Sequence, residues 1–334
     1  MLKFDERKRL FKKKKKHLLK LQKKISIKSY VYYFLLFLII IFIILKVVRK
    51  TPNKFEEKNF ICFCALAKKE NLYIRELVNY HKNIGFSKFI LVDNNDVNSE
   101  KLSDVLQDYI KSGLVEIINS IGQSINQGST YQYLYENYKD KCQWINFFDC
   151  DEYLVLYPQN GKNITIREFL ENPRYDKCES ILINWLMYDD NDLLHYENRT
   201  LIERFTRAVR EHKANRFVKS ITRGGLNRTL FGFDKSSHFP SDKLILCDSS
   251  GKTSDRYSDV IEPPIYEFAH VSHYSTKSTE EYVNKIRRRY PGVNNTNYEE
   301  SIDVYFGTNK FTKEKLKIFE DSFNQKFPDY KHDE

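Results

Sequence analysis

Short apolar runs alternate with amphipathic segments between residues 60 and 149. The apolar runs are 60–67 (FICFCALA), 87–93, 114–118 and 144–149 (WINFFD). The segments between them (71–85, 99–113 and 129–140) place apolar residues at helical spacing, with Ser99 as an expected cap and with Gly85 and Gly113 as expected stops. Strands that alternate with helices predict an α/β fold, in which helices cover both faces of a mostly parallel sheet.

The second half of the chain is less regular. We expect strands at 179–188 and 265–274 and helices at 278–290 and 313–327. The basic and aromatic segment 204–220 (RFTRAVREHKANRFVKS) is expected to be a solvated helix or loop, although some of its cations could contact a substrate.

The positive charge of the chain is concentrated at its amino terminus. The net charge is +10, and residues 1–28 hold thirteen Lys or Arg against two acidic residues, so the remainder is close to neutral. A nucleic-acid-binding domain would carry its basic excess on its own surface. We therefore expect no nucleic-acid partner.

Residues 29–48 (SYVYYFLLFLIIIFIILKVV) follow this basic tail and approach the length that spans a bilayer. A cleaved signal peptide is the alternative, but its apolar core is usually shorter and ends at a small-residue cleavage site. The expected organisation is a cytosolic tail (1–28), a transmembrane signal-anchor (29–48), a stem (49–59) and one large domain (60–330), which the positive-inside rule places across the membrane.

Six cysteines and four N-x-S/T sequons are compatible with a secretory location. No two cysteines form a CxxC pair, so a zinc or redox motif is not indicated. One or two disulfides are possible, and the sequence leaves their pairing open.

Three carboxylates, Asp149, Asp151 and Glu152, follow the fourth apolar run directly, and Asp93 ends the second. Ligands of open α/β sheets bind beyond the carboxyl ends of the strands, so these side chains should converge. Mg²⁺ and Mn²⁺ prefer oxygen ligands and often bridge to phosphates, so a metal–diphosphate site is plausible. The alternative is a solvated acidic turn.

Four segments in order resemble glycosyltransferase family 92 and related family-2-like transferases, once grouped as a domain of unknown function. They are KKENLYIRELVNYHKNIGFSKFILVDNN, WINFFDCDEYLVL, ILINWLMYDDNDLL with RTLIERF, and HVSHYSTKSTEEYVNKIRRRYP. The resemblance covers about residues 60–291. It implies a GT-A fold and a glycosyltransferase of the hexosyltransferase class.

The resemblance also implies roles for single residues. It implies that Asp149 and Asp151 bind the metal and the donor diphosphate, and that His273 completes the metal site. Lys277 would contact the diphosphate, and Glu70 and Asp93 would face the nucleoside. Arg204 and Lys219 also match family positions and could contact the acceptor or the diphosphate. His270 lies three residues before His273, so on a strand the two would point to opposite faces and only one would reach the metal.

The implied chemistry is metal-dependent transfer, with inversion, from a nucleotide sugar (a UDP-sugar is favoured) to a hydroxyl of a glycan or glycoconjugate. The metal would stabilise the leaving diphosphate, and the acceptor needs a general base. Asp190 matches an aspartate of the family, and Asp189 replaces a glycine there, so both are candidates. An acidic loop held by Asx turns is the alternative.

Two other classes compete with this interpretation. A haloacid-dehalogenase-like phosphatase also uses an Asp-x-Asp after a strand, but there it follows the first strand of the domain, whereas three expected strands precede it here. The other is a non-catalytic, membrane-anchored glycan-binding module, and the intact Asp149, Asp151 and His273 argue against it. Because nucleotide sugars are present in the Golgi lumen, we expect a single-pass type II Golgi membrane protein with a luminal domain.

Overall fold

The computed structural model describes residues 59–231, 240–241, 243–289 and 298–324, together with five residues between 13 and 20. The chain divides into two units, Met1–Glu57 and Lys58–Glu334, and every strand of the described chain belongs to the second. The expected anchor at 29–48 lies outside the described residues. Within the described part, no helix has the length and apolar character that a bilayer span requires.

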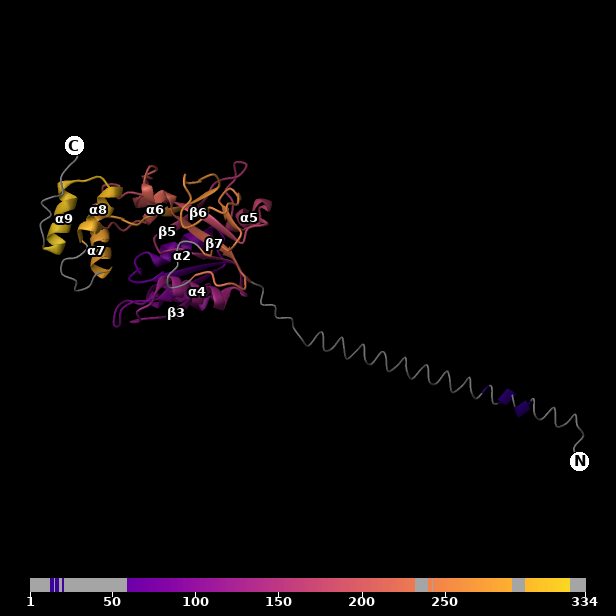
Figure 1. The fold of residues 1–334 in the computed structure, drawn as a ribbon. Helices are drawn as coiled ribbons and strands as arrows, with labels where there is room; N and C mark the ends of the chain where they lie inside the picture. Colours follow the sequence, from indigo (N-terminus) through magenta and orange to yellow (C-terminus); the bar gives the residue numbers. More distant parts are fainter. Residues whose placement is uncertain are drawn as a thin grey trace, which may run out of the picture. The chain divides into compact units, whose positions relative to one another are not determined.

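One mixed sheet organises the second unit (Figure 1). Four strands are parallel neighbours in the order β3-β2-β1-β4: β1 (Asn59–Ala67), β2 (Lys88–Asp93), β3 (Val115–Asn119) and β4 (Cys142–Phe147). The order then continues β7-β6-β9-β5, with β7 (Val218–Arg223), β6 (Ser180–Met187), β9 (Ala269–His273) and β5 (Glu152–Leu156). β8 (Leu246–Asp248) pairs with the start of β6.

Helices cover both faces of the parallel part, as the alternating pattern predicts. Ile61 and Phe63 of β1 share an apolar cluster with α2 (Ile74–Asn83) and α3 (Leu102–Lys111). Cys62 and Cys64 belong to a second cluster with α4 (Gln127–Tyr138). Successive side chains of a strand point to opposite faces, so β1 lies at the centre of both cores.

Three helices near the carboxyl terminus form an apolar cluster of their own: α7 (Thr279–Arg289), α8 (Tyr298–Thr308) and α9 (Lys313–Phe323). Figure 1 shows them together beside the strands, with α6 (Leu201–Arg204) between them and the sheet. Two buried ion pairs connect this cluster to its surroundings. Arg204 with Glu281, at 2.6 Å, joins α6 to α7, and Asp190 with Lys315, at 2.7 Å, joins the end of β6 to α9. The short helix α5 (Ile166–Leu170) belongs to the larger core.

Two local expectations were wrong. Ser99 is not the cap of α3, which begins at Leu102: the Asp104 side chain accepts from the Lys101 backbone N–H, and Asp93 accepts from that of Leu102. The segment 204–220 is not a solvated helix or loop throughout, because it contains α6 and the first residues of β7.

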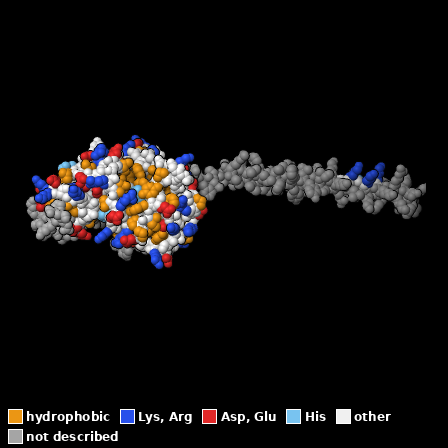
Figure 2. Space-filling model, turned by 90° about the horizontal axis from the view of Figure 1, so that it is seen from above, with side chains coloured by type: hydrophobic (Ala, Val, Ile, Leu, Met, Phe, Trp, Pro, Cys, Tyr) orange, Lys and Arg blue, Asp and Glu red, His pale blue; other side chains and the backbone are white. Residues whose placement is uncertain are grey.

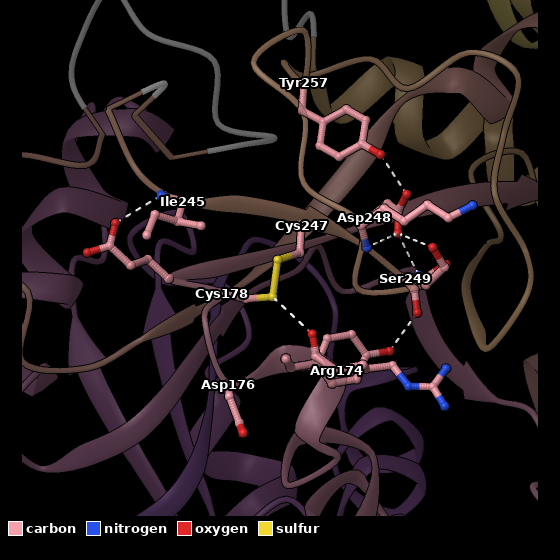
Figure 3. The surroundings of a disulfide bond; sticks show 12 residues. Arg174, Asp176, Cys178, Ile245, Cys247, Asp248, Ser249 and Tyr257 are labelled. Carbon is pink, nitrogen blue, oxygen red and sulfur yellow. Dashed lines mark hydrogen bonds between the residues drawn. A yellow bond between two sulfur atoms is a disulfide. The ribbon is translucent and has the colours of Figure 1, made fainter.

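Two disulfides stabilise the sheet. Cys62–Cys142 joins the neighbouring strands β1 and β4, and Cys178–Cys247 joins the segment before β6 to β8. Figure 3 shows the second bond beside Asp248, whose carboxylate accepts a hydrogen bond from Tyr257 at 2.6 Å. Cys64 and Cys150 are free and buried.

The surface carries both signs of charge. On the face that Figure 2 shows, hydrophobic side chains gather in the middle, with acidic and basic groups interspersed around them. Large apolar side chains are exposed at several described positions. Two of these, Leu72 and Tyr196, line the cavity described below.

Candidate functional site

The strand directions bring one end of many strands to the same edge of the sheet. The parallel strands β1, β2 and β4 end there. β6 also ends there, because it runs antiparallel to β7, which runs antiparallel to β4, and β9 runs parallel to β6. β5 and β7 run the other way and therefore begin there. As a result Asp149, Asp151, Glu152, Lys219 and His273 form one cluster, although they come from four strands or strand ends.

Lys219, at the start of β7, neutralises two of the three carboxylates. Its ammonium lies 2.9 Å from Asp149 Oδ2 and 3.4 Å from Glu152 Oε2, and its side chain is fully buried. Asp149 Oδ1 accepts from Gln127 at 2.7 Å and from Tyr131 at 3.2 Å. Every oxygen of the Asp149 carboxylate thus has a partner within the protein.

Burial and charge act in opposite directions on these groups. Burial would raise the pKa of Asp149, but Lys219 outweighs it and the pKa lies below its usual value. Burial raises the pKa of Glu152 well above its usual value, against the effect of Lys219. Burial alone would lower the pKa of Lys219, but the negative charges of Asp149 and Glu152 outweigh burial. The pKa of Lys219 is therefore higher than its ordinary value, and the ammonium keeps its proton.

Asp151 lies between a lysine and a histidine. Its Oδ2 is 2.9 Å from the ammonium of Lys285 on α7, and its Oδ1 is 3.6 Å from His273 Nε2. Burial opposes ionisation of Asp151, yet Lys285 and His273 hold its pKa well below the usual range. The His273 ring packs on Trp185 with the ring centres 4.2 Å apart. Asp151 is therefore held as a carboxylate beside an imidazole.

A cavity of about 650 Å³ is joined to this cluster through Lys285. Its wall is formed by the segments after β1 and β9, by the loop before α3 and by α7, and it includes Leu72, Tyr73, Glu100, Tyr196, Lys277 and Lys285. This volume is within the range of small-molecule sites in proteins. Lys285 connects the cavity to the cluster, because it lines the cavity and contacts Asp151.

Lys277 and Glu70 lie beside this cavity, whereas the Asp93 carboxylate accepts hydrogen bonds from the segment that follows β2. The Lys277 ammonium is 3.9 Å from Glu70 Oε2 and 4.1 Å from the ring centre of Tyr73. Asp93 is 2% exposed and accepts from Asn95 and from the Leu102 backbone N–H. The predicted nucleoside contact of Asp93 stays a prediction.

The two candidate bases differ in exposure. Asp190 is fully buried and accepts from Lys315 at 2.7 Å and from Tyr305 at 2.6 Å. The Asp189 side chain is 17% exposed and pairs with Arg207 at 3.0 Å. Asp190 thus joins the end of β6 to α8 and α9, whereas Asp189 is the more accessible to an acceptor. Their catalytic roles stay predictions.

The two histidines of β9 lie in separate surroundings, as their spacing predicts. His270 contacts the rings of Tyr157 and Tyr266, and its Nε2 lies 3.0 Å from Ser272 Oγ. His273 instead faces Asp151. Of the two, His273 is the one in the carboxylate cluster.

The cluster offers few donor atoms to a divalent cation. Among the described residues, no group of three His, Cys, Asp or Glu side chains is arranged to hold a metal ion. Asp151 and His273 face one another, and His273 Nδ1 has no hydrogen-bond partner within the described chain. A two-ligand set fits Mg²⁺ or Mn²⁺, which often take one or two protein ligands and complete their shell with water and substrate phosphate.

The sequence did not place either of the two lysines beside the carboxylates. Lys219 was named only as matching a family position that could contact a substrate, and Lys285 lay only in an expected helix. The sequence offered one weak signal for Lys219, an uncompensated cation within the apolar pattern FVKSI. Lys285 gave no signal, because charged residues are frequent on the surfaces of helices.

The comparison with known families identifies the chain. The sequence model of glycosyltransferase family 92 matches residues 58–305. This chain belongs to glycosyltransferase family 92. The match confirms the resemblance seen in the sequence, and it contains every candidate site residue from Glu70 to Lys285.

Two curated relatives carry the same family name. One, from Arabidopsis thaliana, is 20% identical over 151 residues, which are 42% of this chain and 23% of that protein. The other, from Oryza sativa subsp. japonica, is 22% identical over 126 residues, or 34% of this chain and 19% of that protein. The chain therefore spans about a fifth of the length of the relatives it matches.

Solved structures show weaker similarity. Residues 1–349 of S. aureus TarS, in complex with UDP-GlcNAc, match at a TM-score of 0.39 and 12% identity, over 79% of this chain and 72% of that one. The mannosyltransferase PcManGT from Pyrobaculum calidifontis, in complex with GDP-Man and Mn²⁺, matches at 0.34 and 7%, over 79% and 73%. TM-scores below 0.5 do not establish a shared fold.

Proposed function

We propose that this member of family 92 is a GT-A glycosyltransferase that transfers a sugar from a nucleotide donor to a hydroxyl group of a glycan or glycoconjugate. The observation that carries the proposal is the link between the Asp151–His273 pair and the cavity: Lys285 contacts Asp151 and lines the cavity together with Lys277. Cations on one wall of that cavity suit a diphosphate, and the exposed faces of Leu72 and Tyr196 suit a base or a sugar ring.

The proposed reaction inverts the anomeric carbon. The acceptor hydroxyl attacks this carbon, a carboxylate takes the proton, and the bond to the diphosphate breaks. We assign the role of general base to Asp189, because a base must come within hydrogen-bond reach of the acceptor and Asp190 is fully buried. Asp190 then positions its neighbour through Lys315 and Tyr305.

Asp151 and His273 would hold a Mn²⁺ or Mg²⁺ ion, which supplies positive charge to the leaving diphosphate. Asp149 would act mainly by holding Lys219 and the turn that follows β4. Lys277 would contact the diphosphate directly and Glu70 would hold the Lys277 side chain in place, because the two lie 3.9 Å apart.

We further propose that residues 29–48 anchor the protein as a type II membrane protein with its catalytic unit in the Golgi lumen. The apolar run after a basic tail supports this orientation. The two disulfides also support it, because disulfides form in oxidising compartments such as the secretory pathway.

The test is a screen of the full-length protein against a panel of nucleotide sugars with Mn²⁺ or Mg²⁺, alongside Asp151→Asn. We expect one donor to release its nucleoside diphosphate, and we expect that release to be lost with chelator and in the variant. If no donor is turned over and none binds, a non-catalytic glycan-binding module becomes the better interpretation. Turnover that survives both chelator and the variant would remove the metal from the proposal.

A further inference from the structure

Two lysines balance the carboxylate cluster, and they differ in their access to the cavity. The Lys219 side chain is fully buried and cannot reach a ligand without unfolding its surroundings. The Lys285 side chain is 36% exposed and lines the cavity. Only Lys285 can therefore exchange its protein partner for a ligand.

Lys285 has few bonds within the protein. Its ammonium contacts Asp151 Oδ2 and the Ser275 carbonyl, each at 2.9 Å, which uses two of its three N–H donors. An ion pair at a partly exposed position contributes little net stability, and a lysine head on a four-carbon stem reorients easily. The same residue lines the cavity.

We infer that Lys285 is an exchangeable counter-cation: it neutralises Asp151 while the cavity is empty of donor and turns to the donor diphosphate when a divalent cation takes its place on Asp151. This inference rests on the proposed function. Lys285 would then contact the leaving diphosphate. The divalent cation and the nucleotide would each strengthen the binding of the other, because the cation frees Lys285 from Asp151 and the diphosphate frees Asp151 from Lys285.

The inference predicts effects of opposite sign for one substitution. Lys285→Met removes the competitor for Asp151, so Mn²⁺ alone should bind about two- to fivefold more tightly, the range of a partly exposed ion pair. The same variant lacks a cation for the diphosphate, so UDP should bind about tenfold more weakly at saturating Mn²⁺. Lys285→Arg keeps the charge and should bind Mn²⁺ no more tightly than wild type.

Trp185 provides the measurement. It packs on His273, and Trp144 is the only other tryptophan of the chain. In a Trp144→Phe background, paramagnetic Mn²⁺ at Asp151 should quench Trp185 fluorescence, and titration with Mn²⁺ gives its affinity without turnover. Binding of UDP, with GDP in parallel, is measured by calorimetry on the same full-length proteins. Lys111→Met, on the exposed end of α3, controls for the loss of one positive charge.

The outcomes separate this inference from the proposed function. Tighter Mn²⁺ binding with weaker nucleotide binding in Lys285→Met alone supports the exchange. If wild type binds both ligands and Lys285→Met leaves Mn²⁺ affinity unchanged or lowers it, the exchange is overturned while the transferase stands. If wild type shows neither Mn²⁺ quenching nor nucleotide binding, the metal site falls and the exchange falls with it.

Discussion

Removing the buried ammonium of Lys219 should destabilise the folded unit by a predictable amount. In Lys219→Met, the chain keeps a side chain of similar length while Asp149 and Glu152 lose the cation between them. The Asp149 carboxylate keeps its bonds to Gln127 and Tyr131, but Glu152 Oε1 already has no hydrogen-bond partner in the described chain. The variant therefore leaves the buried Glu152 carboxyl group and the partly exposed Asp149 carboxylate without their cation.

The contact distances set the size of the effect. At an effective dielectric constant of about 20, an ion contact at 2.9 Å is worth about 6 kcal/mol and one at 3.4 Å about 5 kcal/mol. Desolvation of the ammonium offsets much of this, and removal of one partner from a buried pair typically costs about 3–5 kcal/mol. For a unit of this size, this corresponds to a fall of about 6–10 °C in the unfolding temperature.

The variant should also respond to pH in a characteristic direction. The pKa of Glu152 is already raised by burial, and the loss of Lys219 raises it further. The folded state then binds a proton that the unfolded state does not, so stability rises as pH falls from 8 towards the ordinary pKa of a glutamate. The deficit of Lys219→Met relative to wild type should therefore shrink between pH 8 and pH 5.

Thermal unfolding in the presence of chelator, followed by circular dichroism, measures both effects. Adding Glu152→Gln to Lys219→Met removes one uncompensated charge, so it should recover part of the stability and flatten the pH response. Lys213→Met is the matched control, because it removes a lysine from the short helical turn before β7. A deficit under about 2 °C that does not change with pH would refute the assignment of Lys219 as the counter-charge.

Three further substitutions test other polar groups of the fold. Arg204→Met leaves the buried Glu281 carboxylate without its cation, so the free energy of unfolding should fall by about 3–5 kcal/mol. A second substitution, Glu281→Gln, should restore much of this stability in thermal melts. Burial lowers the pKa of His81 to about 3, so between pH 6.5 and 3 the unfolded state binds more protons than the folded state. Stability should therefore fall as pH falls, by about 1.4 kcal/mol per pH unit. In His81→Leu the urea midpoint should depend less steeply on pH, and an unchanged pH dependence would contradict this origin. Asp190→Asn removes the partner of Lys315, so the unfolding temperature should fall and amide exchange in α9 should rise; lost turnover without either change would instead make Asp190 the base.

The parallel half of the fold could be predicted from local pattern alone. The runs that became β1, β2 and β4 are apolar because both faces of each strand are covered, and Gly113 ends α3 with a positive φ of 78°. β7 could not be found this way, because Lys219 and Arg223 interrupt its apolar pattern. These cations are acceptable inside the sheet only because their partners come from distant segments.

The site could be predicted as far as the carboxylates and no further. Asp149 and Asp151 follow a strand end, and their convergence on one edge follows from the parallel order. Disulfide pairing could not be derived, because six cysteines allow many connectivities and only the strand order places Cys62 beside Cys142. The burial of Asp190 depends on α8 and α9, which lie more than a hundred residues further along the chain.

The antiparallel strands explain how three carboxylates coexist at one edge. In a purely parallel sheet, only the loops after strand carboxyl ends reach that edge, and here those loops supply Asp149 and Asp151. β7 runs the other way and brings Lys219 to the edge from its first residues, while β5 brings Glu152. The compensating charge is thus built into the sheet, where the Lys219 side chain is fully buried. Lys285 comes instead from a helix at the cavity wall, and it is the cation that a ligand can replace.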